Sequence, residues 1–201
     1  GSRELTAADY VYQIKRLADP RLNCPIFSTM TKYIVGLDEL GQELAGELAR
    51  IRAERRRRAG VLYNQERDES DNPIWLDLDQ FEFEGVRVVD RFVYEIELNR
   101  KYPQFVYWLA MPFFAPIPRE ADRFFAQEPI VRRNLKIDNR PIGTGPYRME
   151  HLIAHKEIVF VRNENYRDDY YPSEGEGMDH EKGLLAHAAG EVSQPLNGVH
   201  V

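Results

Sequence analysis

The stretch PIGTGPY, residues 141–147, contains two glycines whose spacing is typical of phosphate-binding loops. Two glycines around one residue can cradle a phosphate, but a Walker loop also needs a Lys-Ser/Thr pair and a following helix. Here Pro146 removes an N–H donor, and a strand pattern follows in place of a helix. We therefore expect a tight turn, in which Gly143 and Gly145 supply positive φ and Tyr147 begins a strand.

The histidines and the single cysteine are the next candidates for a metal site or a nucleophile. His151 and His155 are four residues apart, but the surrounding pattern is strand–turn–strand and lacks an HExxH glutamate. Asp179, His180 and His187 are spread along a polar segment, and Cys24 precedes a proline in a loop. The acidic residues of 168–176 lie in a turn instead of on facing elements. We predict no catalytic residues, no metal ligands and no cofactor, and we expect Cys24 to be inert.

Two further groups of residues could contact a partner molecule or a membrane. Residues 50–58, RIRAERRRR, form a dense basic patch that could contact nucleic acid or an acidic lipid surface. The patch ends a predicted helix, where positive charge suits the macrodipole, so a solvated helix end is the favoured interpretation. The aromatic stretch FVYWLAMPFF, residues 105–114, is expected to be core, with a ligand groove or a partner surface as the alternative.

Composition bounds the class of protein. The chain has 201 residues, 43% of them hydrophobic, which is enough to bury a core. Its net charge of −6 argues against a nucleic-acid partner. No apolar run is long enough to span a bilayer. Gly1 and Ser2 are expected to be a cloning scar, and the chain is expected to be an excised piece of a larger protein.

Local patterns predict several helices before the middle of the chain. The first follows Thr6, a predicted N-cap with Asp9 three residues on, and stops at Asp19-Pro20. Residues 26–34 predict a short helix. Residues 38–58 predict a long one with a leucine stripe that stops at Gly60. Residues 64–73 are predicted to be a polar loop.

The pattern then changes to period two. Residues 81–98 alternate in antiparallel fashion, with Phe81, Phe83, Val88 and Phe92 among the residues expected on the buried face. Helices are predicted from Pro103 and over residues 119–127, and strands over residues 147–153 and 157–162. A short helix is predicted around residues 181–189, with no final element after it. The mixture indicates an α+β fold, an antiparallel sheet with several packed helices.

The order of these motifs resembles a known family. The stretches LTAADYVYQIKRLADP, YPQFVYWLAMPFFAPIPRE, PIGTGPYRM and RNENY resemble the family 5 extracellular solute-binding proteins. These are the oligopeptide, dipeptide and nickel-binding receptors of ABC importers. The resemblance covers about residues 3–190 and is weakest over residues 38–74, which look longer than in the usual receptor.

The resemblance implies a fragment of a two-lobed periplasmic binding protein (type II, cluster C-like). Residues 3–140 would form the inserted subdomain of lobe one, residues 141–190 the return strands and turn-rich segment of the main lobe, and residues 191–201 a tail. PIGTGPY would be the turn between them. The family's DP…P segment places its ligand wall at Asn23, Pro25, Ile26 and Phe27, with Ile26 where the family has a tyrosine.

The function implied is that of a solute receptor, not an enzyme. It would capture an oligopeptide or other small solute and deliver it to an ABC permease in the inner membrane. The receptor would be periplasmic, or lipid-anchored at the outer face of the cytoplasmic membrane. This chain alone is expected to show no high-affinity binding. The alternative is an interaction module that contacts a partner or membrane through the basic helix of residues 38–58 and binds no ligand itself.

Overall fold

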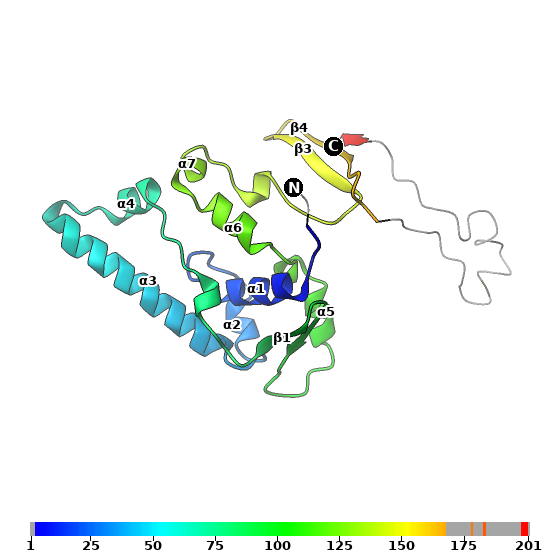
Figure 1. Cartoon of the computed structure of the whole chain (residues 1–201), viewed down its shortest axis with the longest axis horizontal. Helices are drawn as coiled ribbons and strands as arrows, with labels where there is room; N and C mark the ends of the chain where they lie inside the picture. The colour runs from blue at the N-terminus through cyan, green and yellow to red at the C-terminus, as the bar shows by residue number, and fades with distance from the viewer. Residues whose placement is uncertain (1–2, 168–177, 179–182, 184–197, 201) are drawn as a thin grey trace. The chain divides into compact units, whose positions relative to one another are not determined.

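In the computed structural model, which describes residues 3–167, 178, 183 and 198–200, the chain divides into two units between Ile137 and Asp138. Helices and small antiparallel sheets make up both units, which confirms the predicted α+β class (Figure 1). The assignment of residues 3–140 to an inserted subdomain and of residues 141–190 to the main lobe stays a prediction.

Helix α1 (Ala7–Leu17) begins after the predicted N-cap, Thr6. Asp9 forms the capping box, because its carboxylate accepts the backbone N–H of Thr6 at 2.9 Å. Burial would raise the pKa of the Asp9 carboxyl, but hydrogen bonds from Arg3 and Thr6 outweigh it and the pKa is lowered. The LTAADYVYQIKRLADP stretch therefore opens with a charged carboxylate that accepts hydrogen bonds from Arg3 and Thr6.

Helices α2 (Phe27–Met30) and α3 (Leu37–Ala59) follow, and both were expected, although α2 is shorter than predicted. The leucine stripe of α3 is buried as predicted, and Ile51 at its end is half-buried. Gly60 ends the helix with a positive φ of 66°. The core that this stripe joins draws on residues from Tyr12 to Phe114. Its buried members are Tyr12, Ile14, Leu17, Ala18, Ile26, Met30, Ile34, Leu37, Leu40, Leu44, Leu48, Ile74, Leu76, Leu78, Val86, Phe105 and Phe114.

The loop predicted over residues 64–73 is wrong, because it contains helix α4 (Gln65–Asp71). The Asn64 side chain caps α4 by accepting the backbone N–H of Arg67 at 2.9 Å. Two arginines of α3 then pair with α4, as described below, and α4 lies beside the far end of α3 (Figure 1). A polar helix of seven residues is barely stable in water by itself, so these contacts with α3 stabilise it.

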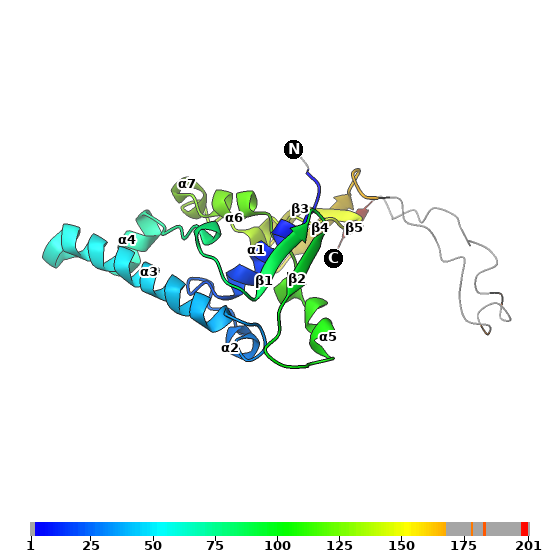
Figure 2. The ribbon, with the colours of Figure 1, turned by 60° about the horizontal axis from the view of Figure 1, so that its bottom comes forward.

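The hairpin of β1 (Val86–Asp90) and β2 (Val93–Ile96) is shorter than the predicted strands. Phe81 and Phe83 lie outside it, after the 3₁₀ turn η2 (Leu78–Gln80). Figure 2 shows the hairpin beside α1, where Tyr94 stacks on Tyr10 with ring centroids 5.2 Å apart.

Two residues expected on the buried face of this hairpin, Val88 and Phe92, are exposed. The prediction fails because only the first residue of β1, Val86, reaches the core, whereas Val88 on the same face is exposed and Phe92 lies in the turn between the strands. Phe92 stands at the end of the hairpin, where the guanidinium of Arg91 lies over its ring at 5.2 Å.

The aromatic segment supplies α5 (Phe105–Leu109) and the 3₁₀ turn η3 (Pro112–Phe114). Phe105 and Phe114 are buried as predicted and meet edge to face, whereas Val106, Tyr107 and Met111 are exposed. Helices α6 (Arg119–Phe125) and α7 (Glu128–Val131) complete the first unit, and the 3₁₀ turn η4 (Ile137–Asn139) spans the division between the units.

In the second unit, β3 (Tyr147–Ile153) and β4 (Glu157–Arg162) confirm the predicted hairpin. Strand β5 (Gly198–His200) pairs antiparallel with β4, although the sequence predicted no final element. Three residues carry too little pattern to indicate a strand, so this pairing depends on β4. The helix predicted over residues 181–189 lies, apart from Gly183, outside the described residues, as do Asp179, His180 and His187.

Within the described residues, no helix combines the length and the apolar character that crossing a bilayer requires.

Candidate functional site

The four residues predicted to face a ligand lie in and after the loop that joins α1 to α2. Asn23 and Pro25 are exposed, and Asn23 has a positive φ of 48°. Ile26 is 8% exposed and belongs to the core. Phe27 is half-buried, and its ring lies so close to Gly41 of α3 that a Cβ there would stand 2.4 Å from the ring. The loop thus presents Asn23 and Pro25 to solvent and anchors itself through the two residues that follow.

A buried ion pair fixes the start of this loop. The Asp19 side chain is fully buried and accepts the backbone N–H and the Nε–H of Arg21, both at 2.9 Å. The same guanidinium donates to the backbone oxygen of Ile74 at 2.6 Å and lies over the ring of Trp75 at 5.6 Å. Asp19 of the DP motif therefore serves to hold the loop in position and is not itself exposed to a ligand.

A second polar cluster joins α1 to α6. Asp122 accepts the hydroxyl of Tyr12 at 2.8 Å and pairs with the nearly buried guanidinium of Arg16 at 3.1 Å. Arg16 also donates to Gln13 at 3.0 Å, and Gln13 donates to the backbone oxygen of Phe113 at 2.8 Å. Burial and the adjacent carboxylate raise the pKa of Tyr12, so the hydroxyl remains a proton donor. Much of the first family motif is thus scaffold that positions the loop.

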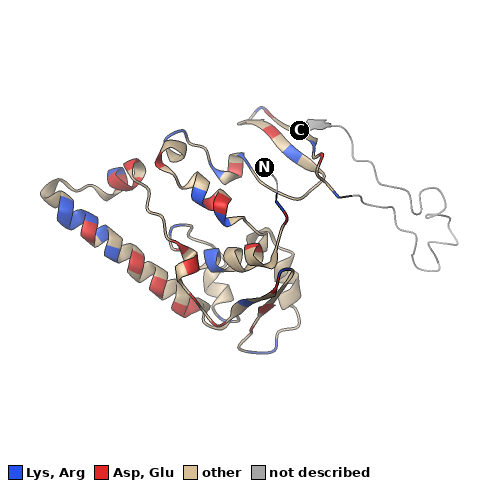
Figure 3. Cartoon of the chain, viewed as in Figure 1, with Lys and Arg blue, Asp and Glu red and all other residues tan. Residues whose placement is uncertain are grey.

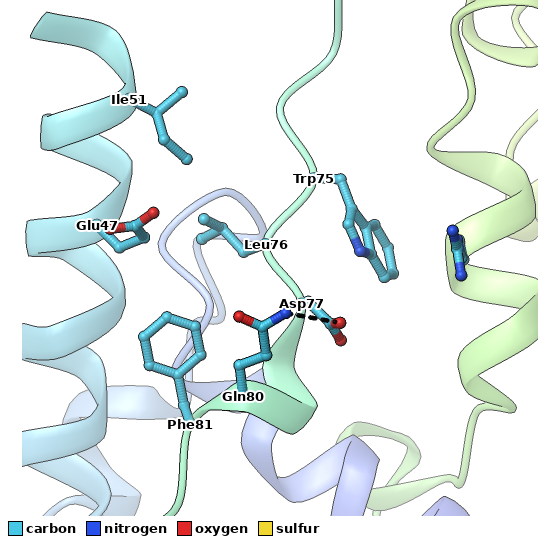
Figure 4. Close-up of a pocket in the computed structure, with 8 residues that line it drawn as sticks. Glu47, Ile51, Trp75, Leu76, Asp77, Gln80 and Phe81 are labelled. Carbon is cyan, nitrogen blue, oxygen red and sulfur yellow. Dashed lines mark hydrogen bonds between the residues drawn. The ribbon is translucent and has the colours of Figure 1, made fainter. Parts of the chain in front are cut away.

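The first unit also has a recess of about 540 Å³ between α3, residues 75–81 and α6 (Figure 4). In Figure 4, Ile51 and Glu47 of α3 lie opposite the segment that carries Trp75, Leu76 and Asp77. The lining consists of Glu47, Ile51, Trp75, Leu76, Asp77, Gln80, Phe81 and Arg123.

Its polar groups are largely engaged by their neighbours. Asp77 accepts from Arg119 at 2.8 Å and from Gln80 at 3.3 Å. The lining is mixed, since four of its eight residues are apolar and the other four are polar or charged. Sequence reasoning missed it because its walls come from three segments far apart in the chain.

The remaining candidates for chemistry stay dispersed. His151 lies on β3 with Nε2 3.4 Å from Glu157, and His155 is in the following turn with φ 60°. Cys24 is a half-buried free thiol. Within the described part of the chain, no group of three His, Cys, Asp or Glu side chains could hold a metal ion.

The PIGTGPY turn does lead into β3 as predicted, but its glycines do not adopt positive φ. A residue far along the sequence stabilises the turn, since the side chain of Asn163 donates a hydrogen bond to the backbone oxygen of Gly145 at 2.9 Å. The backbone N–H of Asn163 also donates to the Pro146 oxygen at 2.8 Å. The asparagine of the RNENY motif thus holds the PIGTGPY turn against the end of β4.

Comparison with known proteins accounts for this scaffold. The model of the family described as bacterial extracellular solute-binding proteins, family 5 Middle, matches residues 1–180. The chain belongs to this family. Among curated family 5 relatives, it is 22% identical over 209 residues to the periplasmic oligopeptide-binding protein OppA of Salmonella typhimurium. That match covers 98% of this chain and 30% of OppA.

Solved structures show the same fold. A periplasmic oligopeptide-binding protein of Borrelia burgdorferi, OppAIV, is similar with a TM-score of 0.54 at 14% identity, covering 92% of this chain and 31% of that one. OppA of Haemophilus influenzae in complex with the peptide RPPGFSPFR is similar with a TM-score of 0.51 at 17% identity, covering 81% and 24%. The family 5 chain described here therefore has the fold of part of these two-lobed proteins, and it spans about 30% of the curated relative's length.

Proposed function

We propose that this chain is part of the substrate-binding component of an ABC importer, which captures a peptide or similar small solute and delivers it to the permease. The observation that carries the proposal is the family 5 match over residues 1–180. The likeness to OppA and to peptide-bound structures of the same fold supports a peptide as the solute. Members of this family are solute-binding proteins, so the proposed role involves no catalysis.

In this proposal the α1–α2 loop forms one wall of the ligand site. The amide of Asn23 has both donors and an acceptor, which matches the alternating groups of a peptide backbone. Pro25 adds a rigid apolar ring beside it. The anchoring of the loop through Asp19 and Arg21 would keep both side chains in place before the ligand arrives, which lowers the entropy lost on binding.

The proposed location follows from the same relatives. OppA of Salmonella typhimurium is periplasmic, and the family is extracellular. We therefore propose that the protein lies in the periplasm, or on the outer face of the cytoplasmic membrane. In the second case a lipid anchor would keep it close to the permease.

The test is peptide binding by the full-length gene product, measured by calorimetry with a pool of di- to hexapeptides. Asn23→Gly removes the amide but keeps the left-handed backbone, and we expect Kd to rise about tenfold, the equivalent of one or two hydrogen bonds. Asn134→Gly is the matched control, because Asn134 is exposed with a φ of 52°. Absence of peptide binding would refute the proposed function, whereas equal binding by both variants would refute the role of Asn23 alone.

A further inference from the structure

The end of helix α3 carries two apolar side chains with almost no protein around them. Val61 and Leu62, in the 3₁₀ turn η1 (Gly60–Leu62), have relative exposures of 103% and 93%. No other large apolar side chain among the described residues is as exposed. We call residues 56–62 the α3 tip. Such exposure is unfavourable in water, so the tip needs an explanation other than folding.

The α3 tip is also strongly basic in an acidic chain. The tip, residues 56–62, contains three arginines and no carboxylate, whereas the whole chain has a net charge of −6. Figure 3 shows the basic residues gathered at this end of α3 and acidic ones toward its beginning. Arg56 and Arg57 are exposed, and within the described residues neither side chain has an ion pair or hydrogen bond. Two free guanidinium groups thus stand within two helical turns of Val61 and Leu62.

Ion pairs join α3 to α4 next to the tip without using these two arginines. Arg52 donates to both carboxylate oxygens of Glu69 at 2.7 and 2.8 Å, and Arg55 pairs with Asp68 at 2.9 Å. The hydrogen bond from Arg52 lowers the pKa of Glu69, so this pair stays charged at neutral pH. Helix α4 therefore braces α3 next to the tip and leaves Arg56 and Arg57 facing solvent.

We propose that the α3 tip docks on a membrane surface that contains anionic lipids. The arginines would contact the headgroups, and Val61 and Leu62 would enter the boundary between headgroups and acyl chains. A bilayer fits this shape better than a protein does. Two side chains at a convex end would need a matching pocket in a protein, whereas lipids rearrange around any protruding apolar group. The inference is independent of the solute that the protein carries.

The test is co-sedimentation of the chain with vesicles of an equimolar mixture of phosphatidylcholine and phosphatidylglycerol, compared with pure phosphatidylcholine. We expect binding to the anionic vesicles that weakens as salt is raised. R56Q/R57Q should weaken binding about 25-fold, or roughly fivefold for each arginine near an anionic surface. V61S/L62S should weaken it about tenfold, because apolar insertion is lost. Thermal unfolding should be unchanged in both variants, since all four side chains are exposed.

The matched control is R100Q/K101Q, which removes the same number of positive charges. These two exposed residues lie near the beginning of α3, since the guanidinium of Arg100 is over the Tyr33 ring at 4.7 Å. Unchanged binding by this control, with losses in both tip variants, supports the proposal. Equal binding to neutral vesicles, or an equal loss in the control, overturns it. Binding to phosphatidylcholine vesicles that carry the permease but not to the anionic lipid mixture would also refute it, in favour of a protein partner.

Discussion

Gly85 lies directly before β1, and we expect the addition of a single methyl group there to lower the stability of the first unit strongly. A Cβ added there would lie 1.9 Å from the backbone oxygen of Val35 and 3.0 Å from the Cγ2 of Ile34. Because real Cβ contacts essentially never fall below 3.0 Å, the two backbone segments would have to separate by about 1 Å. Gly85→Ala is therefore a test of how closely the β1 hairpin packs on the segment before α3.

The magnitude follows from the interactions at this contact. The Gly85 oxygen accepts the N–H of Glu97 at 2.8 Å, and the Glu97 oxygen accepts the N–H of Val35 at 3.1 Å. Loss of two hydrogen bonds costs about 2 kcal/mol, and loosened packing of buried Ile34 and Val86 costs about 1–2 kcal/mol more. The reduced entropy of the unfolded chain offsets about 0.5 kcal/mol. We expect a net loss of about 3 kcal/mol, or a fall in Tm of about 6–12 °C.

Urea unfolding followed by tryptophan fluorescence is the assay, because both tryptophans, Trp75 and Trp108, lie in the first unit. Gly46→Ala is the matched control. Gly46 is in the exposed interior of α3 with no atom within 4 Å of an added Cβ, so the same substitution should stabilise the unit by about 1 kcal/mol. If Gly85→Ala is as stable as the parent, or if both variants shift in the same direction, the geometric reasoning is refuted.

Two further predictions concern the ion pairs. Replacing Arg52 and Glu69 with alanine, singly and together, should give a coupling energy of about 0.5–1 kcal/mol, because both side chains are partly exposed. The folded-state pKa of Glu69 lies below its ordinary value of 4.5. The coupling energy should therefore be constant above pH 4.5 and decline as the pH falls through the lower, folded-state pKa. A coupling energy that grows in acid would contradict this. Asp122→Ala should cost about 3–5 kcal/mol, because it leaves the nearly buried guanidinium of Arg16 unpaired. Asp122→Asn should cost less because it retains an acceptor for Tyr12, and equal melting of the two variants would show that this acceptor contributes nothing to stability.

Local signals explain the elements that the sequence predicted well. Helix α1 begins directly after Thr6 because Asp9 is placed to close the capping box, and α3 ends directly before Gly60 because glycine adopts the positive φ at the C-cap. The β3–β4 hairpin was also predicted with its bounds, since its alternation and its turn lie within adjacent residues. The motifs that carry the family resemblance belong to this group, and for that reason the family match was foreseeable.

Contacts between distant segments explain the elements that were missed. Helix α4 depends on arginines of α3, and β5 depends on an edge of β4 about forty residues earlier. At the candidate site, the sequence marked Ile26 and Asn23 together, but only the packing of α2 on the core decides that Ile26 is buried and Asn23 exposed. The basic run at the end of α3 was visible in the sequence. Only the tertiary structure decides which of these arginines pair with α4 and which remain free beside Val61 and Leu62. That distinction depends on where α4 places its carboxylates.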